Sequence, residues 1–220
     1  MSIDQEITIF LNGFVGKSHP LGAIIAQLLT ATSFGNAMLP MAIITGLWFS
    51  RGYQTTRDRM ILGACASLGM TALSRSLELL VRIQPRPYLA MDLNLAPGFQ
   101  LDVSRLSSFP SDHATLVFGL CAVIFLRHKG LGIASFAWMM VICAAGVALG
   151  LHWPSDIVAG LVLGVVAVVL SQRLRYPEWA WKWVWDFEEL HSGPFYGLML
   201  LGAYETATFF GDIQTLCRLL

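Results

Sequence analysis

Long apolar runs are the feature that most restricts how this chain can fold. About 20 consecutive apolar residues cross a bilayer as a helix, and several runs here approach or exceed that length. Charged residues make up only 13% of the chain, whereas about 25% is usual for a soluble domain. The runs are continuous rather than alternating, which argues against a transmembrane barrel. We therefore predict an all-α polytopic membrane protein.

The spacing of apolar and polar residues predicts where the helices lie. Residues 3–15 carry apolar side chains at helical spacing, and we interpret them as a short interfacial helix. A short buried helix is predicted over 21–32. Spans are predicted over 35–50, 60–83, 112–127, 131–151 and 155–173, and residues 194–210 are a candidate for a last, short span.

We expect a single membrane domain over residues 1–220. Its core covers 1–176, and residues 177–220 hold a Trp-rich segment that precedes the candidate last span. Because Trp is enriched at the headgroup level, we interpret that segment as an interfacial anchor. The indole side chains are those of Trp179, Trp181, Trp183 and Trp185.

Charge and cysteine usage exclude two classes of partner. The formal net charge is zero, so we expect no broad basic field and no nucleic-acid partner. The four cysteines are scattered and lack metal-ligand spacing, so we interpret them as packing residues. The oligomeric state stays open at this level.

The distribution of Lys and Arg predicts the orientation in the membrane. These residues gather in three segments, namely 51–59, 127–129 and the stretch after 172. The positive-inside rule places all three in the cytoplasm. The polar connections at 84–110 and 152–155 then share the extracytoplasmic side.

The tripeptide Pro-Ser-Asp occurs twice, each time beside a histidine and where an apolar run meets a polar stretch. The first copy, at 110–112, is followed directly by His113. The second copy, at 154–156, follows His152 with one residue between them. Arg86, followed by proline, stands at a third such place. In the predicted topology all three segments lie on the extracytoplasmic face.

Two histidines, an acid and an arginine can cleave a phosphate ester through a phosphohistidine. One histidine attacks phosphorus, an acid behind it fixes its tautomer, and the other histidine protonates the leaving oxygen. His152 and Asp156 are four residues apart and would pair on a helix. Ser111 and Asp112 are suited to cap a helix that begins near 112. Arg86 can bind phosphate through two parallel hydrogen bonds.

In this order, the motifs resemble the signatures of the type 2 phosphatidic-acid phosphatase superfamily. Residues 110–113 resemble the Pro-Ser-Gly-His signature, and the Asp variant is similar to bacterial undecaprenyl-pyrophosphate phosphatases of the bacitracin-resistance type. His152 and Asp156 match the end of the third signature, Ser-Arg-x5-His-x3-Asp. Arg86 and its proline match the end of the first, Lys-x6-Arg-Pro. The resemblance covers about residues 5–173.

This resemblance implies a six-helix membrane bundle with an N-terminal interfacial helix. It implies His152 as nucleophile, His113 as general acid, Asp156 as the residue that orients the nucleophile, and Arg86 as phosphate binder. It implies no metal and no cofactor. The expected partners are the bilayer of a bacterial plasma membrane and a lipid phosphate substrate, of which a polyprenyl pyrophosphate is the best match.

Two positions depart from the family pattern. Leu79 stands where the first signature has its lysine, and Gly146 stands where the third has its arginine. Gly146 and Gly150 form a small-residue face, as do Gly160 and Gly164, and we interpret both faces as helix-packing surfaces. Three cations are candidates to replace the missing charges, namely Arg75, Arg82 and Arg105. Glu78 is expected to pair with one of the first two.

Three alternatives to a polyprenyl pyrophosphatase remain open. The substrate could be another phospholipid, such as phosphatidic acid or phosphatidylglycerol phosphate. The phosphohistidine could pass its group to another lipid or sugar rather than to water. The loss of cations at Leu79 and Gly146 favours a third reading, a protein that binds or moves a lipid phosphate without cleaving it. His152, His113 and Asp156 argue against that reading, because a binder needs no nucleophile.

Overall fold

A computed structural model describes residues 1–220 with the exception of 16–23, 25–36, 82–83, 95–106, 175–177 and 208–220. The regular structure in the described ranges is helical. Its elements are α1 (Ile3–Asn12), α3 (Met38–Phe49), a 3-10 helix η1 (Arg51–Thr56), α4 (Arg57–Val81), α5 (Pro87–Ala90), α6 (Asp112–Arg127), α7 (Lys129–Ala148), α8 (Pro154–Arg173), α9 (Glu178–Leu190) and α10 (Ser192–Ala207).

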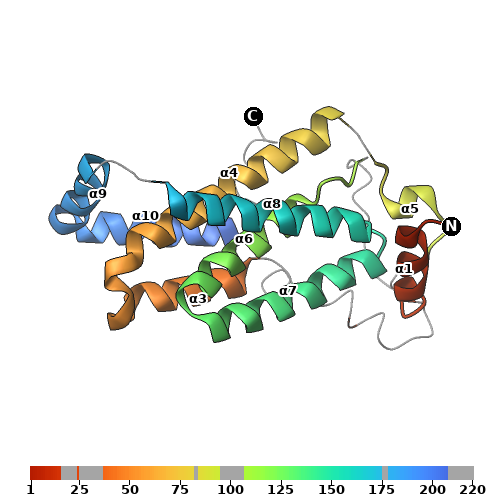
Figure 1. Ribbon diagram of the computed structural model, residues 1–220, viewed down its shortest axis with the longest axis horizontal. Coiled ribbons are helices and arrows are strands. Elements are labelled where there is room, and N and C mark those ends of the chain that lie inside the picture. Colours follow the sequence, from red (N-terminus) through yellow and green to blue (C-terminus); the bar gives the residue numbers. More distant parts are fainter. Residues whose placement is uncertain (16–23, 25–36, 82–83, 95–106, 175–177, 208–220) are drawn as a thin grey trace.

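Helix α6 forms the centre of the bundle. Its residues from Ala114 to Ile124 are buried without interruption, as expected for a helix that is apolar on all sides. Helices α3, α4, α7 and α8 pack around it. The helices run roughly along the long axis of the molecule, with α1 and α5 at one end and α9 at the other (Figure 1).

Glycines in α8 allow α6 and α8 to approach closely. A Cβ at Gly160 would lie 2.7 Å from the carbonyl oxygen of Ser111, and a Cβ at Gly164 would lie 2.9 Å from the backbone nitrogen of Gly119. Both distances are shorter than a carbon atom tolerates, so only glycine fits. The prediction that Gly160 and Gly164 form a packing face is confirmed, and this contact brings the first turns of α6 and α8 together.

Gly146 is buried in α7, but the described residues do not show the close helix contact that the packing interpretation requires. A Cβ at this position would meet no atom within 4 Å in the described part of the chain, apart from its own helix backbone. Within the described ranges, a Cβ at Gly146 would therefore be tolerated, unlike one at Gly160 or Gly164. The spacing of Gly146 and Gly150 was misleading because small-residue spacing by itself does not say whether a second helix lies opposite.

Among the described residues, three helices are long and apolar enough to cross a membrane, and they lie over Arg57–Glu78, Lys129–Ala148 and Pro154–Arg173. Helix α3 is apolar but shorter, and α6 and α10 have 16 residues each. All of them fall within or near the predicted spans, while the number of spans in a bilayer stays a prediction. The helix expected over 21–32 lies outside the described residues except for one position.

The Trp-rich segment is a helix rather than an extended stretch. Along α9, Trp179 and Trp183 share an exposed face. Trp181 stacks on Trp185 at 6.0 Å between ring centroids, and Trp185 lies 6.3 Å from Trp48 of α3. The alternation in the sequence therefore divides the indoles between a face that packs on the bundle and a face left exposed.

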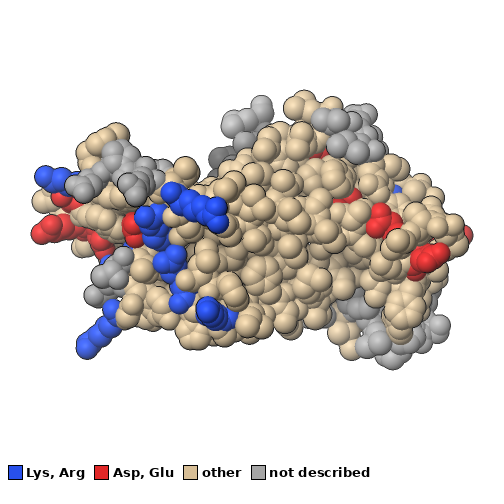
Figure 2. All heavy atoms as spheres, in the orientation of Figure 1, with Lys and Arg blue, Asp and Glu red and all other residues tan. Residues whose placement is uncertain are grey.

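Charged side chains are concentrated at the two ends of the molecule. On the face shown in Figure 2, an uncharged belt separates two charged ends: Lys and Arg side chains lie together with Asp and Glu toward the α9 end, and mainly Asp and Glu lie at the α1 end. Several of the basic residues are held in place there. Arg59 donates to the carbonyl oxygens of Gln172 and Leu174, and Arg127 donates to the side chain of Gln172 at 2.8 Å.

Candidate active site

The connection from α7 to α8 carries His152, and a glycine turn shapes it. Gly150 has φ of +72°, a left-handed conformation that favours glycine. The Leu151 N–H donates to the Gly146 carbonyl at 3.0 Å, and the Gly150 N–H donates to the Val147 carbonyl at 2.9 Å. This pair of bonds is the Schellman arrangement that ends a helix. It leaves His152 in the turn before α8, not on a helix as its spacing from Asp156 suggested.

Two acceptors face the Nδ1 atom of His152. This atom lies 3.1 Å from the Ser108 carbonyl oxygen and 3.8 Å from Oδ2 of Asp156. A carbonyl oxygen can only accept, so the contact with Ser108 favours the tautomer with hydrogen on Nδ1. The lone pair of the neutral ring then resides on Nε2. Since 12% of the side chain is exposed, the ring is mostly enclosed but still accessible.

Asp156 joins the two Pro-Ser-Asp segments. Its side chain is fully buried, and Oδ2 accepts from the Trp153 N–H at 2.7 Å. Its backbone carbonyl accepts from the Ser111 N–H at 3.3 Å. Its Oδ1 has no hydrogen-bond partner among the residues that the structure describes. The carboxylate thus caps α8 and keeps the capacity to accept a further hydrogen bond near His152.

The first turn of α6 is capped as predicted. Ser111 is the N-cap, and its Oγ accepts from the Ala114 N–H at 3.2 Å. Oδ1 of Asp112 accepts from the His113 N–H at 2.7 Å. His113 is partly exposed in this turn. The positive end of α6 therefore lies beside the residue proposed as general acid.

Arg86 is a buried hub, only 4% exposed. Its guanidinium donates from Nε to the Ser107 carbonyl at 3.2 Å, from Nη1 to the Leu151 carbonyl at 3.0 Å, and from Nη2 to Oε1 of Glu78 at 2.9 Å. A guanidinium has five N–H groups, so these bonds leave two for a ligand. Arg86 thereby connects α4, the 84–110 connection and the turn that carries His152.

Backbone contacts complete the link between the three signature segments. Pro85 and Ser107 form an isolated antiparallel bridge, and the Ser108 N–H donates to the Gln84 carbonyl at 2.9 Å. The indole N–H of Trp153 donates to the Pro85 carbonyl at 2.8 Å. Segments up to 68 residues apart in the chain thus form one connected cluster.

Arg75 is the candidate cation that the structure places in this cluster. Its Nη1 lies 2.7 Å from Oε2 of Glu78, which confirms the expected pair, and 3.8 Å from Oδ2 of Asp112. It lies one helical turn before Leu79 on α4, so both residues share a helix face. The other two candidates, Arg82 and Arg105, lie outside the described residues.

Several contacts of the cluster were not anticipated from the sequence. The carbonyls of Ser107, Ser108 and Leu151 are backbone groups, so no residue type marks them. The bond from Arg86 to Glu78 joins residues eight apart in the chain. The only sign of it in the sequence is that Glu78 is an acidic residue within a predicted apolar span. In the described ranges, no group of three or more His, Cys, Asp or Glu side chains is arranged to hold a metal ion.

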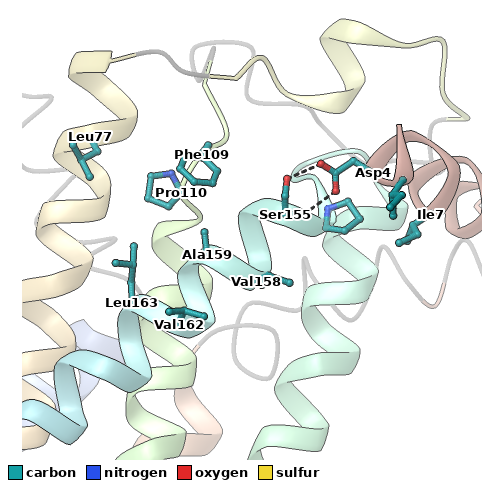
Figure 3. Close-up of a pocket in the computed structure, with 12 residues that line it drawn as sticks. Asp4, Ile7, Leu77, Phe109, Pro110, Ser155, Val158, Ala159, Val162 and Leu163 are labelled. Atoms are coloured by element: carbon teal, nitrogen blue, oxygen red, sulfur yellow. Dashed lines mark hydrogen bonds between the residues drawn. The ribbon is translucent and has the colours of Figure 1, made fainter. Parts of the chain in front are cut away.

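An apolar pocket of about 740 Å³ adjoins the cluster (Figure 3). Its walls come from α1, α4, α8 and the residues just before α6. The lining residues are Ile3, Asp4, Ile7, Leu77, Phe109, Pro110, Pro154, Ser155, Val158, Ala159, Val162 and Leu163. Both Pro-Ser-Asp segments therefore contribute to its wall, although the two histidines do not line it.

Known proteins resemble this chain in sequence. Over 66 residues it is 39% identical to the bacitracin transport permease protein BcrC of Bacillus licheniformis, a match that covers 29% of this chain and only 31% of that protein. Over 158 residues it is 23% identical to the undecaprenyl-diphosphatase BcrC of Bacillus subtilis strain 168, covering 72% of this chain and 78% of that protein.

A solved structure and a family model extend the comparison. The crystal structure of Aquifex aeolicus LpxE aligns with a TM-score of 0.59 at 22% sequence identity, covering 79% of this chain and 97% of that chain. At this identity the alignment shows a shared fold. The model of the PAP2 superfamily matches residues 60–180, a range that contains Arg86, His113 and His152. Because this match spans more than half of the sequence, the chain belongs to the PAP2 superfamily.

Proposed function

We propose that this protein is an integral-membrane lipid phosphatase that hydrolyses a polyprenyl pyrophosphate, such as undecaprenyl pyrophosphate, through a phosphohistidine. The observation that carries the proposal is the setting of His152. Its Nδ1 faces the Ser108 carbonyl at 3.1 Å with Asp156 at 3.8 Å, which favours a nucleophilic Nε2. Family membership and a relative described as an undecaprenyl-diphosphatase support the same reaction.

The first chemical step forms the covalent intermediate. Nε2 of His152 attacks the terminal phosphorus, and the bond from that phosphorus to the bridging oxygen breaks. His113 gives a proton to the leaving oxygen of the lipid monophosphate. The imidazolium that forms at His152 is stabilised by Asp156, which is buried and keeps an oxygen without a hydrogen bond in the described part of the chain.

The second step regenerates the enzyme. A water molecule attacks the phosphorus of the phosphohistidine and transfers a proton to His113, which is now a base. The bond between phosphorus and nitrogen breaks, and inorganic phosphate leaves. His152 returns to its neutral form, with Nδ1–H still facing Ser108.

Two arginines and a helix terminus are suited to hold the phosphoryl oxygens. Arg86 retains two N–H groups beyond its three protein contacts. The first turn of α6, capped by Ser111 and Asp112, adds a positive helix end. Arg75 supplies the charge that the lysine at the position of Leu79 provides in relatives, because Arg75 lies one turn away and reaches Asp112.

The apolar pocket accommodates the start of the lipid chain. It adjoins both Pro-Ser-Asp segments and is lined almost entirely by apolar side chains of α1, α4 and α8, so a chain that enters from the bilayer can reach the phosphate site. The Lys and Arg side chains at the α9 end support a cytoplasmic location for that end by the positive-inside rule, which counts basic residues. The phosphate site, at the opposite end, then faces the extracytoplasmic side.

Phosphate release from undecaprenyl pyrophosphate by the purified protein in mixed micelles tests the proposal. We expect turnover by the wild-type protein and by His191→Ala, a control that removes an exposed histidine. His152→Ala should release no phosphate above background. A substrate labelled with ³²P on its terminal phosphate should leave an acid-labile label on the wild-type protein and none on His152→Ala. Equal rates for the wild-type and His152→Ala proteins would contradict the proposal.

The same assays separate the rival functions. A panel with phosphatidic acid and phosphatidylglycerol phosphate identifies a different lipid substrate, and an added lipid or sugar acceptor reveals phosphotransfer. The missing cations at Leu79 and Gly146 favour a lipid-phosphate binder without catalysis. Binding of undecaprenyl pyrophosphate with neither turnover nor a covalent label would support that function instead.

A further inference from the structure

Helix α1 forms one wall of the apolar pocket, and Asp4 ties this wall to α8. We propose that Asp4 is a positioning residue that holds α1 against the pocket and thereby sets a preference for long-chain lipid pyrophosphates over short-chain ones. The inference rests on the proposed function, because it assigns the apolar pocket to the lipid chain of the same substrate.

The carboxylate of Asp4 makes two hydrogen bonds to one residue. The Ser155 N–H donates to Oδ1 at 3.0 Å, and the Ser155 Oγ donates to Oδ2 at 2.7 Å (Figure 3). Asp4 and Ser155 are 151 residues apart in the chain. Ser155 belongs to the first turn of α8, whose free N–H groups favour a negative charge. A carboxylate is therefore the group best suited to this place.

The residues beside Asp4 present an apolar surface to the pocket. Ile3 and Ile7 are four apart on α1 and therefore share a helix face, and both line the pocket. Ala159 and Leu163 of α8 line it from another side. Ile3 is 76% exposed, so a lipid chain in the pocket would cover apolar surface that the protein itself leaves open.

A second anchor holds the other end of α1. The Asn12 side chain donates to the carbonyls of Ala148 at 2.8 Å and Asn94 at 3.0 Å, and it accepts from the Asn94 N–H at 2.8 Å. These bonds are independent of Asp4. Loss of the Asp4 carboxylate should therefore release only the first half of α1, which carries Ile3 and Ile7, while the helix stays attached.

The catalytic groups do not depend on the Asp4 contact. Asp156 keeps its own bond from the Trp153 N–H at 2.7 Å, and His152 keeps its contact with the Ser108 carbonyl. A looser wall should therefore weaken binding of a chain long enough to fill the pocket without slowing the chemical step. If Asp4 only stabilised the fold, its loss would impair both binding and the chemical step. If Asp4 holds the pocket wall, its loss impairs only the binding of long chains.

The test compares steady-state phosphate release from undecaprenyl pyrophosphate and from geranyl pyrophosphate, whose chain is short. For Asp4→Ala we expect KM for the long-chain substrate to rise about tenfold, the effect of losing a methylene-sized contact. Its kcat and both constants for geranyl pyrophosphate should stay within about twofold, as for a loss of uniform binding. Glu6→Ala, which removes an exposed carboxylate from the same turn, should match the wild type.

Three further variants distinguish loss of the pocket wall from misfolding. Asp4→Asn should retain wild-type kinetics, because an amide can accept from the Ser155 N–H and donate to its hydroxyl. Ile7→Trp should fill the pocket and raise the long-chain KM, whereas Ile9→Trp, on an exposed position of the same helix that does not line the pocket, should not. An unchanged long-chain KM in Asp4→Ala, or equal losses on both substrates, would overturn the inference.

Binding measurements keep the inference separate from the proposed function. Equilibrium binding of both lipids is measured in the His152→Ala background, with and without Asp4→Ala. A Kd that rises only for undecaprenyl pyrophosphate supports the wall even if the wild-type protein releases no phosphate. In that case the proposed hydrolysis fails alone. Kd values that are unchanged, or that rise equally for both lipids, count against the wall whether or not the protein is a phosphatase.

Discussion

Glu78 and Arg86 form a buried ion pair, and removal of one partner should cost more stability than removal of both. Glu78 and Arg86 are each 4% exposed, and Nη2 of Arg86 donates to Oε1 of Glu78 at 2.9 Å. Glu78 also accepts from Arg75 at 2.7 Å. The perturbations are Glu78→Leu, Arg86→Met and the double variant, which replaces the pair with apolar side chains.

The expected magnitudes follow from burial. A charge-assisted hydrogen bond contributes about 1.5–3 kcal/mol, and the bond from Arg75 about 0.5 kcal/mol, because its side chain is one-third exposed. Each single variant also leaves a buried charge with fewer partners, so we expect a loss of about 3 kcal/mol. The double variant leaves neither charge and should lose at most about 2 kcal/mol. The coupling free energy is then about 4 kcal/mol or more.

Thermal unfolding in detergent, followed by circular dichroism, measures these changes. A loss of about 3 kcal/mol corresponds to a fall in Tm of about 6–12 °C for a chain of this size. The control Glu189→Leu, on an exposed position of α9, should change stability by less than about 0.5 kcal/mol. Single variants that lose less than about 1 kcal/mol, or losses that simply add in the double variant, would refute the reasoning.

Phosphate release from the same variants tests the second role of Arg86. The double variant should regain much of the stability and none of the turnover, because the guanidinium proposed to hold phosphate is gone. Wild-type turnover in the double variant would show that Arg86 acts only as a structural hub.

Three other changes have defined outcomes. Arg75→Ala should lower kcat about 100-fold, as for one donor to a transition-state oxygen, with partial recovery in Arg75→Lys; unchanged phosphate release would exclude Arg75 as the replacement cation. Gly150→Ala should cost about 1–2 kcal/mol because its φ is +72°, and an unchanged Tm would contradict this. Gly164→Leu should cost about 1–3 kcal/mol by overpacking against Thr115 and Gly119, whereas Gly197→Leu, where a Cβ meets no described atom within 4 Å, should leave Tm nearly unchanged.

The long apolar helices were predictable because their signals are local. The run over 60–83 became α4 at Arg57–Val81, and the run over 155–173 became α8 at Pro154–Arg173. Length and apolar composition decide such segments within a single stretch of chain. Pro154 and Ser111 marked two helix starts for the same reason, since proline at the first turn and a serine cap act on neighbouring N–H groups.

Packing partners were less predictable. Gly160 and Gly164 lie against α6, whereas Gly146, in a similar small-residue pattern, has no described neighbour within 4 Å of its Cβ position. A pattern of small residues shows that close approach is allowed, but not which helix lies opposite. Likewise, the expected pair of Arg75 and Glu78 was local and was found, while the bond from Glu78 to Arg86 depends on how the chain leaves α4.

The sequence by itself determined the class of the protein, the approximate positions of the long apolar helices and the residue types available for phosphoryl transfer, because these depend on side chains close together in the chain. Only the tertiary structure decided that His152 faces the carbonyl of Ser108, that Arg86 joins Glu78 to Leu151, and that Asp4 ties α1 to Ser155. These contacts join residues up to 151 positions apart. They exist because the bundle packs its helices around α6, and no local pattern encodes that arrangement.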